Sequence, residues 1–221
     1  VSARPSFFLP SSRIGACTKT YSYSFTVQCS FLYLWKKYSF FCMIMVCEKT
    51  WQGEFMEKPK ILVLIGSDSD LPVIKDGLEF LKEVGIPFRL DISSAHRQPE
   101  KTINYAQRAR TEGIEVIIAV AGMAAHLPGV VASHTTIPVI GVPTSGGVLN
   151  GIDALLSIVQ MPKGIPVATV GIDASRNAAI LACKILSIKY DEVRKKLDKM
   201  KSDMKKYNED KSKKLKDILE D

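Results

Sequence analysis

The stretch that decides the fold is Ile61-Leu62-Val63-Leu64-Ile65, which ends at Gly66 and runs straight into Ser67-Asp68-Ser69-Asp70. An unbroken run of apolar residues, several of them β-branched, is typical of a strand buried on both faces of a parallel sheet. The next segment, from Leu71 to Val84, has apolar residues at helical spacing and stops at Gly85-Ile86-Pro87. The sequence therefore predicts a buried strand that leads directly into a helix.

The same alternation continues to residue 188. We predict further strands at 88–92, 116–121, 139–142 and 167–170, and further helices at 99–111, 124–133, 152–159 and 174–188. Strands that alternate with helices imply right-handed βαβ crossovers and a parallel sheet covered on both faces. The expected fold class is α/β, a three-layer sandwich with a central parallel sheet of flavodoxin-like or Rossmann-like type.

Charge is spread unevenly along the chain. The formal charge is +4 over residues 1–56, zero over 57–188 and +3 over 189–221. A nucleic-acid partner needs positive charge on a folded face, and here the predicted domain is neutral. No stretch contains the ~20 apolar residues needed to span a bilayer. We therefore expect neither a nucleic-acid partner nor a membrane span.

Residues 1–55 differ in composition from the rest, because they hold 13 of the 18 aromatic residues and four of the five cysteines. We interpret them as an extension outside the catalytic domain at 56–188, and the hypothesis is a misassigned start with the natural start at Met56. Gly53-Glu54 can be encoded by a ribosome-binding sequence, which supports this. An unstructured or weakly docked extension is the alternative. The segment lacks a secretory signal, so we expect a cytoplasmic protein.

Residues 189–221 predict a lysine-rich C-terminal helix. Its apolar residues step by four and three and form a narrow seam: Leu186, Tyr190, Val193, Leu197, Met200, Met204 and Tyr207. Two interpretations are open. The helix folds back on its own domain, or it docks on another subunit.

Polar residues follow the predicted strands, where parallel sheets bind ligands. Ser67, Ser69 and Asp70 come after the first strand. Hydroxyls and backbone N–H groups at a helix start suit an anion, and an acidic side chain there can hold a ribose hydroxyl. Ordinary helix capping is the alternative.

Ser94, His96 and Arg97 follow the second strand. An arginine suits bidentate binding of phosphate, and a histidine suits proton transfer near neutral pH. An exposed surface pair is the alternative.

The loop after the third strand, residues 121–129, is small and apolar except for His126. Small residues let the backbone close on a planar ligand, which one polar group can orient. A core or capping histidine is the alternative. The loop at 143–151 can act as a lid or supply N–H donors. We expect His134 to be a surface residue and Cys183 to lie in the core.

Several chemistries lack their motifs. The sequence has no Gly-x-Gly-x-x-Gly after the first strand, no Walker A lysine, no cluster of metal ligands and no Gly-x-Ser-x-Gly. The expectation is a phosphate-bearing small molecule and proton transfer by histidine, with no cofactor and no metal.

The motifs together resemble one family in order and spacing, the N5-carboxyaminoimidazole ribonucleotide mutases of purine biosynthesis, also called the PurE family. The resemblance runs from about Lys60 to Ile188 and rests on four stretches: 66–70 (GSDSD), 94–97 (SAHR), 124–129 (AAHLPG) and 157–167 (SIVQMPKGIPV).

The resemblance implies conversion of N5-carboxyaminoimidazole ribonucleotide into 4-carboxy-5-aminoimidazole ribonucleotide without metal, biotin or ATP. It implies that Ser67, Asp70 and Arg97 bind the nucleotide, with Arg97 and nearby hydroxyls at the phosphate. It makes His96 the proton shuttle, and the loop with His126 closes over the ring and confines CO2. Members form octamers with active sites near subunit contacts, so we expect a homo-oligomer.

Two alternatives remain. A related subfamily carboxylates aminoimidazole ribonucleotide directly with CO2. Its segment after the second strand resembles Ser-Ala-His-Lys and its Ala-Ala-His-Leu-Pro-Gly motif is replaced, so Arg97 and His126 both favour the mutase. A non-catalytic flavodoxin-like binding module would explain the fold but not the histidine loops. Met123 stands where many members have glycine, a departure that we expect to matter little.

Overall fold

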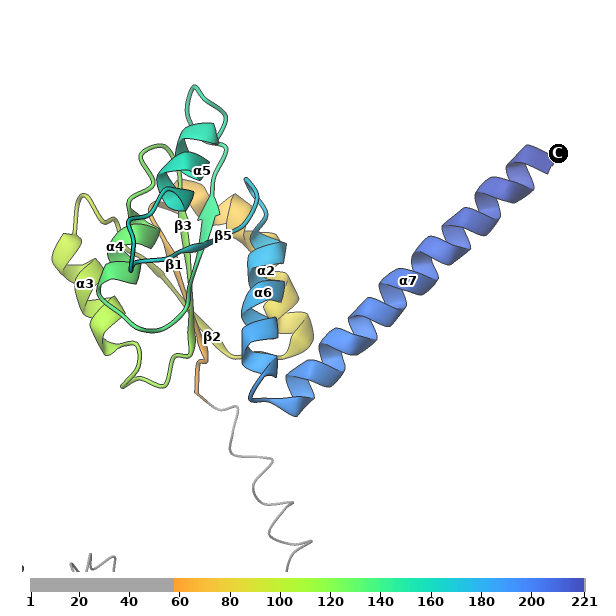
Figure 1. The fold of residues 1–221 in the computed structure, drawn as a ribbon, viewed down its shortest axis with the longest axis horizontal. Helices are drawn as coiled ribbons and strands as arrows, with labels where there is room; N and C mark the ends of the chain where they lie inside the picture. The colour runs from red at the N-terminus through yellow and green to blue at the C-terminus, as the bar shows by residue number, and fades with distance from the viewer. Residues whose placement is uncertain (1–57, 221) are drawn as a thin grey trace, which may run out of the picture. The chain divides into compact units, whose positions relative to one another are not determined.

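The structure is a computed structural model that describes residues 58–220 (Figure 1). Its side chains are described up to residue 215. The predictions for residues 1–55 lie outside the described residues.

A parallel sheet forms the centre of the described domain. Its strands are β1 (Ile61–Ile65), β2 (Phe88–Ile92), β3 (Val116–Ala121), β4 (Val139–Pro143) and β5 (Ala168–Thr169). All neighbours pair in parallel, in the order β2-β1-β3-β4-β5. Ile65 at the end of β1 is in register with Ile92 of β2 and Val120 of β3. The three strands therefore end at the same level, and their following loops share one edge of the sheet.

Helices cover both faces of this sheet (Figure 1). They are α2 (Leu71–Val84), α3 (Pro99–Arg108), α4 (Leu127–Ser133), α5 (Ile152–Val159) and α6 (Ser175–Ser187), with a short 3-10 helix η1 (Asp68–Asp70) before α2. Helix α7 (Asp191–Glu220) follows α6, and among its described side chains only those of the first turns pack in the core. Ile61, Val63 and Ile65 pack in the core shared with α2 and α6, whereas Leu62 and Leu64 pack in the core shared with α3, α4 and α5. This alternation confirms the predicted three-layer α/β sandwich.

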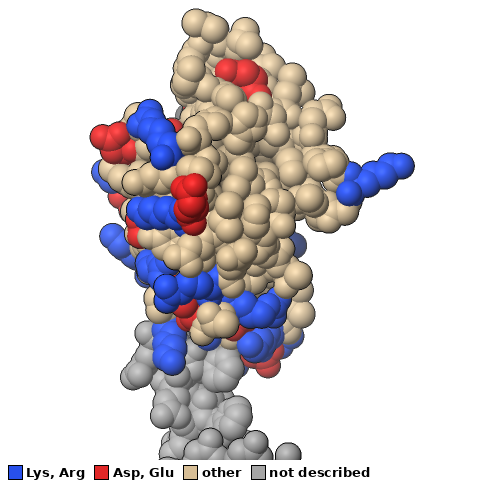
Figure 2. Space-filling view, turned by 90° about the vertical axis from the view of Figure 1, so that its left-hand side faces the viewer, with Lys and Arg blue, Asp and Glu red and all other residues tan. Residues whose placement is uncertain are grey.

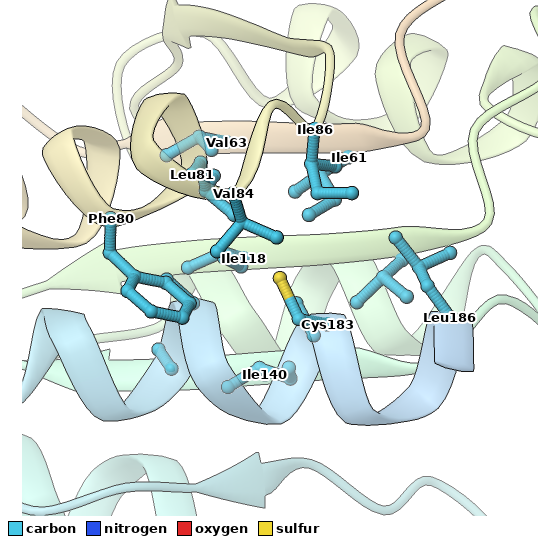
Figure 3. Packing of buried hydrophobic residues seen from close by; sticks show 14 of the residues in the cluster. Ile61, Val63, Phe80, Leu81, Val84, Ile86, Ile118, Ile140, Cys183 and Leu186 are labelled. Atoms are coloured by element: carbon cyan, nitrogen blue, oxygen red, sulfur yellow. The ribbon is translucent and has the colours of Figure 1, made fainter. Parts of the chain in front are cut away.

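The core beneath α2 and α6 is tightly packed. Figure 3 shows Phe80 and Leu81 of α2 and Cys183 of α6 against the sheet residues Ile118 and Ile140. A Cβ placed on Gly77 of α2 would lie 2.7 Å from the carbonyl oxygen of Ser175. The two helices therefore approach so closely that only glycine fits at position 77.

Strand β4 differs from its predicted bounds by one residue at one end and helix α6 by one residue at each end, and three other elements differ for a clear physical reason. Helix α3 ends at Arg108 because the chain turns through Gly113, whose φ of 85° is left-handed, and brings Ile114 into the core. Helix α4 begins at Leu127 because Met123 and Ala125 have left-handed backbone. Strand β5 has two residues, at the edge of the described sheet, where its one partner among residues 58–220 is β4.

Helix α7 divides the predicted seam into two parts. Tyr190, Val193 and Leu197 are buried in the core with α6, so this part folds back on its own domain. Every described side chain from residue 201 to 215 is exposed, including Met204 and Tyr207. The second part of the seam thus has no cover within residues 58–220. None of the helices described is both long and apolar enough to cross a membrane.

Candidate active site

The loops after β1, β2, β3 and β4 enclose a cleft of about 370 Å³. All of the predicted site residues line it, namely Ser67, Ser69, Asp70, Ser94, His96, Arg97 and His126. The cleft lies beside the ends of β1 and β3, where the chain changes from one side of β1 to the other. This is the topological switch point at which open α/β sheets bind their ligands.

The loop after β1 is held by a capping box. The Ser67 N–H donates to Asp70 Oδ2 at 3.1 Å, and the Ser69 N–H donates to Ser67 Oγ at 3.4 Å. Asp70 is only 8% exposed, and the Thr144 hydroxyl donates to its Oδ1 at the long distance of 3.5 Å. Burial raises the pKa of Asp70 above its ordinary value of 3.8. Asp70 therefore caps this turn, as in the alternative of ordinary helix capping that the sequence left open. Its side chain also lines the cleft.

Asp68 is a further group at this turn that we did not predict as a site residue. Its Oδ1 accepts hydrogen bonds from Ser67 Oγ at 2.9 Å and from the Ser69 N–H at 3.0 Å. These bonds lower the pKa of Asp68 below 3.8. The Ser67 hydroxyl and the Ser69 N–H are also donors that a bound anion would need. An anion must therefore displace the Asp68 carboxylate to accept hydrogen bonds from them.

The loop after β2 is fixed at both ends. The Gln98 N–H donates to the Ser94 carbonyl at 2.9 Å, and the Arg97 N–H donates to Ser94 Oγ at 3.3 Å. A buried hydrogen bond of 2.8 Å joins the hydroxyls of Ser93 and Thr102 and ties the loop to α3. His96 and Arg97 are exposed along the cleft, and Arg97 forms no salt bridge within residues 58–220.

The loop after β3 has unusual backbone. A Cβ on Gly122 would collide with Thr144 Oγ1, so a side chain has no room there. Met123 has φ of 54° and Ala125 has φ of 36°, a region that costs a non-glycine residue roughly 1–2 kcal/mol. The left-handed φ at Met123 is one that glycine adopts freely, which fits the glycine expected there in many relatives. Strain of this kind is concentrated at functional sites.

This strained turn places His126 beside His96. His96 Nε2 and His126 Nδ1 form a hydrogen bond, with ring centroids 4.6 Å apart and planes at 80°. The contact was not predicted from the sequence. His96 follows β2 and His126 follows β3, and β1 lies between these two strands in the sheet.

The remaining histidine and the core cysteine lie elsewhere. His134 is exposed at the end of α4, where its Nδ1 is 2.9 Å from the Val130 carbonyl oxygen. Cys183 is fully buried, and burial raises the pKa of its thiol to about 12. Both predictions are confirmed. Within the described part of the chain, no three His, Cys, Asp or Glu side chains gather as a metal site would require.

Thr144 is a polar residue of the cleft that the sequence analysis did not predict as a site residue. It is buried, and it contacts both Asp70 and the Gly122 backbone. The sequence indicates that the loop 143–151 can act as a lid or supply N–H donors, but no pattern distinguishes the Thr144 hydroxyl from that of the neighbouring Ser145.

The sheet order and the position of the cleft define a flavodoxin-like α/β protein with a ligand site at its switch point. Residues 60–207 match the AIR carboxylase family. The chain belongs to this family.

Relatives within the family carry two activities in their names. The chain is 56% identical over 162 residues to N5-carboxyaminoimidazole ribonucleotide mutase of Pyrococcus horikoshii, covering 73% of this chain and 92% of the relative. It is 53% identical over 160 residues to the mutase of Thermotoga maritima, covering 72% and 94%. It is also 51% identical over 146 residues to phosphoribosylaminoimidazole carboxylase of Schizosaccharomyces pombe, covering 64% of this chain but 26% of that protein.

A solved structure supports the fold. The crystal structure of Treponema denticola PurE has a TM-score of 0.64 and 30% sequence identity, and it covers 71% of this chain and 98% of that chain.

Proposed function

We propose that this chain is an N5-carboxyaminoimidazole ribonucleotide mutase, which moves a carboxylate from the exocyclic nitrogen of its substrate to a ring carbon. Its similarity to two mutases over more than nine tenths of their length supports this. The observation that carries the proposal is the placement of His96 and Arg97 side by side in the cleft. The carboxylase of Schizosaccharomyces pombe matches over only 26% of its own length, so the mutase is the better supported activity.

Substrate binding follows from the polar groups of the cleft. The Arg97 guanidinium binds the phosphate with the hydroxyls of Ser67, Ser69 and Ser94, because its planar fork matches two phosphate oxygens. Asp70 lies on the sugar or carboxylate side.

His96 carries out both proton transfers. Its imidazolium gives a proton to the exocyclic nitrogen as the bond between this nitrogen and the carboxylate carbon breaks and CO2 leaves. The ring carbon then attacks CO2 and forms the new C–C bond. The proton on that carbon passes to His96, which restores the aromatic ring and the imidazolium. The loop from Ala121 to Leu127 closes over the ring and confines CO2 during the transfer.

The test supplies purified protein with N5-carboxyaminoimidazole ribonucleotide, without metal or cofactor, and follows the product by ultraviolet absorbance. We expect turnover, and we expect His96→Asn to lose about 10²–10⁴-fold in kcat. His134→Asn is the matched control outside the cleft and should react as the wild type does.

Two outcomes would contradict the proposal. Efficient use of aminoimidazole ribonucleotide and CO2 in place of the mutase substrate would make the protein a carboxylase. Activity in neither assay would favour the binding module.

We infer that the enzyme is a homo-oligomer, an octamer by the family resemblance. Helix α5 and the loop before it carry an exposed apolar stripe, with Val148 96% exposed, followed by Leu149, Ile152, Leu156 and Val159. Contiguous apolar patches of this kind mark interaction surfaces. Figure 2 shows a face of the domain whose centre has few charged side chains, with lysine and arginine along its lower edge.

Sedimentation tests this inference. Leu156→Glu should reduce the assembled mass, whereas Ile188→Glu, at an exposed apolar residue outside both α5 and α7, is the control for an added charge. An unchanged mass for Leu156→Glu would exclude α5 from the interface. The cytoplasmic location stays a prediction, which cell fractionation would test.

A further inference from the structure

We propose that His126 is the positioning residue for His96, accepting a hydrogen bond from His96 Nε2–H and so leaving His96 Nδ1 to exchange protons with the substrate. This inference rests on the proposed function and gives His126 a role in the same site.

The contact between the two rings involves one nitrogen of each. The hydrogen bond joins His96 Nε2 to His126 Nδ1. Within residues 58–220, His96 Nδ1 and His126 Nε2 make no hydrogen bond. The rings meet edge on, at 80°, and the His96 side chain is exposed along the cleft. Nδ1 is therefore the nitrogen of His96 that the contact with His126 does not use.

The proposed reaction decides the direction of this hydrogen bond. His96 begins the cycle as an imidazolium with protons on both nitrogens, so its Nε2–H must donate and His126 Nδ1 must accept. After Nδ1 gives its proton to the substrate nitrogen, Nε2 keeps its proton and the bond persists. Nδ1 then holds a lone pair, ready for the proton on the ring carbon. His126 remains neutral throughout, since a second imidazolium in contact would be repelled.

Both backbones are fixed so that the rings stay in place. The turn of His96 is closed by the Gln98 N–H on the Ser94 carbonyl. Before His126, Ala125 is buried with left-handed backbone, and its N–H donates to the Gly122 carbonyl at 3.0 Å. After His126, the buried Leu127 begins α4. Because the hydrogen bond is held at both ends, it can set the orientation of the catalytic imidazole, as a partner of the second nitrogen does in other histidine sites.

The first experiment compares kinetics of two variants. His126→Phe keeps a ring but removes the acceptor, and we expect kcat to fall about 10–100-fold while KM changes little. His126→Asn keeps an acceptor near the position of Nδ1 and should recover most of the loss. His134→Phe is the control outside the cleft.

Three kinetic outcomes would overturn the inference. They are a kcat for His126→Phe within about twofold of the wild type, an equal loss in His126→Asn, or a rise in KM alone, which would make His126 a binding residue.

The second experiment does not depend on activity, and its only variant lies outside the cleft. The chain has three histidines, so nitrogen-15 NMR of histidine-labelled protein gives few signals, and His134→Gln identifies one set. We expect His96 Nε2 to be protonated and His126 Nδ1 to be unprotonated. A proton on His126 Nδ1 would overturn the inference. Absence of turnover in the wild type, with the expected NMR result, would instead contradict the proposed function alone.

Discussion

Asp70 is a buried carboxyl group in the cleft wall, and burial makes its ionised form unfavourable. Its folded pKa lies above the value of 3.8 for the unfolded chain, so the folded protein binds this proton more tightly. Stability therefore falls as pH rises from 3.8 through the raised pKa, and the loss stays constant above it.

Asp70→Asn removes this loss and keeps an oxygen acceptor for the Ser67 N–H. We expect the variant to be more stable than the wild type at pH 7, with the difference vanishing below pH 3.8, measured by chemical unfolding. Its kcat/KM should fall, because the cleft loses a charge.

Asp68→Asn is the control, and we expect it to change the stability of the folded protein in the opposite direction. Hydrogen bonds lower the pKa of Asp68, so its ionised form contributes stability above pH 3.8 that disappears at lower pH. The substitution should destabilise the protein at pH 7. A less stable Asp70→Asn at pH 7 would show that the hydrogen bonds of Asp70 outweigh its burial.

Arg97→Lys tests whether phosphate binding needs the paired N–H donors of the planar guanidinium or only a positive charge. Lysine keeps the charge but not the planar pair of donors. We expect KM to rise about tenfold or more, because a charge-assisted hydrogen bond contributes roughly 1.5–3 kcal/mol and 1.4 kcal/mol is a factor of ten. Steady-state kinetics measure this, with Arg108→Lys as a control on the exposed part of α3.

An unchanged KM would exclude Arg97 from phosphate binding. Use of free CO2 by the variant would mean that position 97 chooses between the two activities named among the relatives.

At the scale of the helices and strands, the apolar pattern predicted β1, α2, β2, β3 and α5 with their observed bounds. The start of α4 was missed because a left-handed backbone at Ala125, a residue with strong helix propensity, leaves no mark in the sequence. The length of β5 was missed because an apolar run does not show how many neighbours a strand has.

Most polar residues of the candidate site were predictable from the sequence, but the contacts between them were not. Parallel strands bring their following loops to one edge, so residues after three strands were expected to meet there. The contact between His96 and His126 depends on the strand order and on strained backbone, and the contact of Thr144 with Asp70 depends on tertiary packing. Neither follows from periodicity.

Helix α7 provides a matched pair of substitutions. Leu197 is 8% exposed in the core, whereas Met204 is 58% exposed on the same seam. Leu197→Ala should lower the free energy of unfolding by about 2–4 kcal/mol because it leaves a cavity.

Met204→Ala should leave the unfolding free energy of the domain unchanged, as measured by urea unfolding, and reduce only the assembled mass if the seam docks on another copy. Equal destabilisation by both substitutions would show that the whole seam packs on its own domain.

At the scale of the whole molecule, we expect a chain that begins at Met56 to fold, assemble and react as the full chain does. The family match begins at residue 60, and all the cleft residues follow it. Thermal unfolding, sedimentation and the mutase assay would compare the two forms.

Deletion of residues 189–221 is the contrasting control, because it removes Tyr190, Val193 and Leu197 from the core and should abolish folding. Loss of solubility or turnover on removing residues 1–55 would mean that this segment belongs to the working protein.

The core around β1 can be completed only late in synthesis, because residues from both ends of the domain form it. Ile61, Val63 and Ile65 leave the ribosome before the rest of their core. They pack with Leu186 of α6 and Leu197 of α7, which are synthesised more than 100 residues later. Contacts so distant in sequence form slowly, and an apolar strand left open in the meantime is prone to aggregation. We therefore expect the nascent chain to be most vulnerable while it is still on the ribosome, where a chaperone can shield the first strand until the last helix arrives.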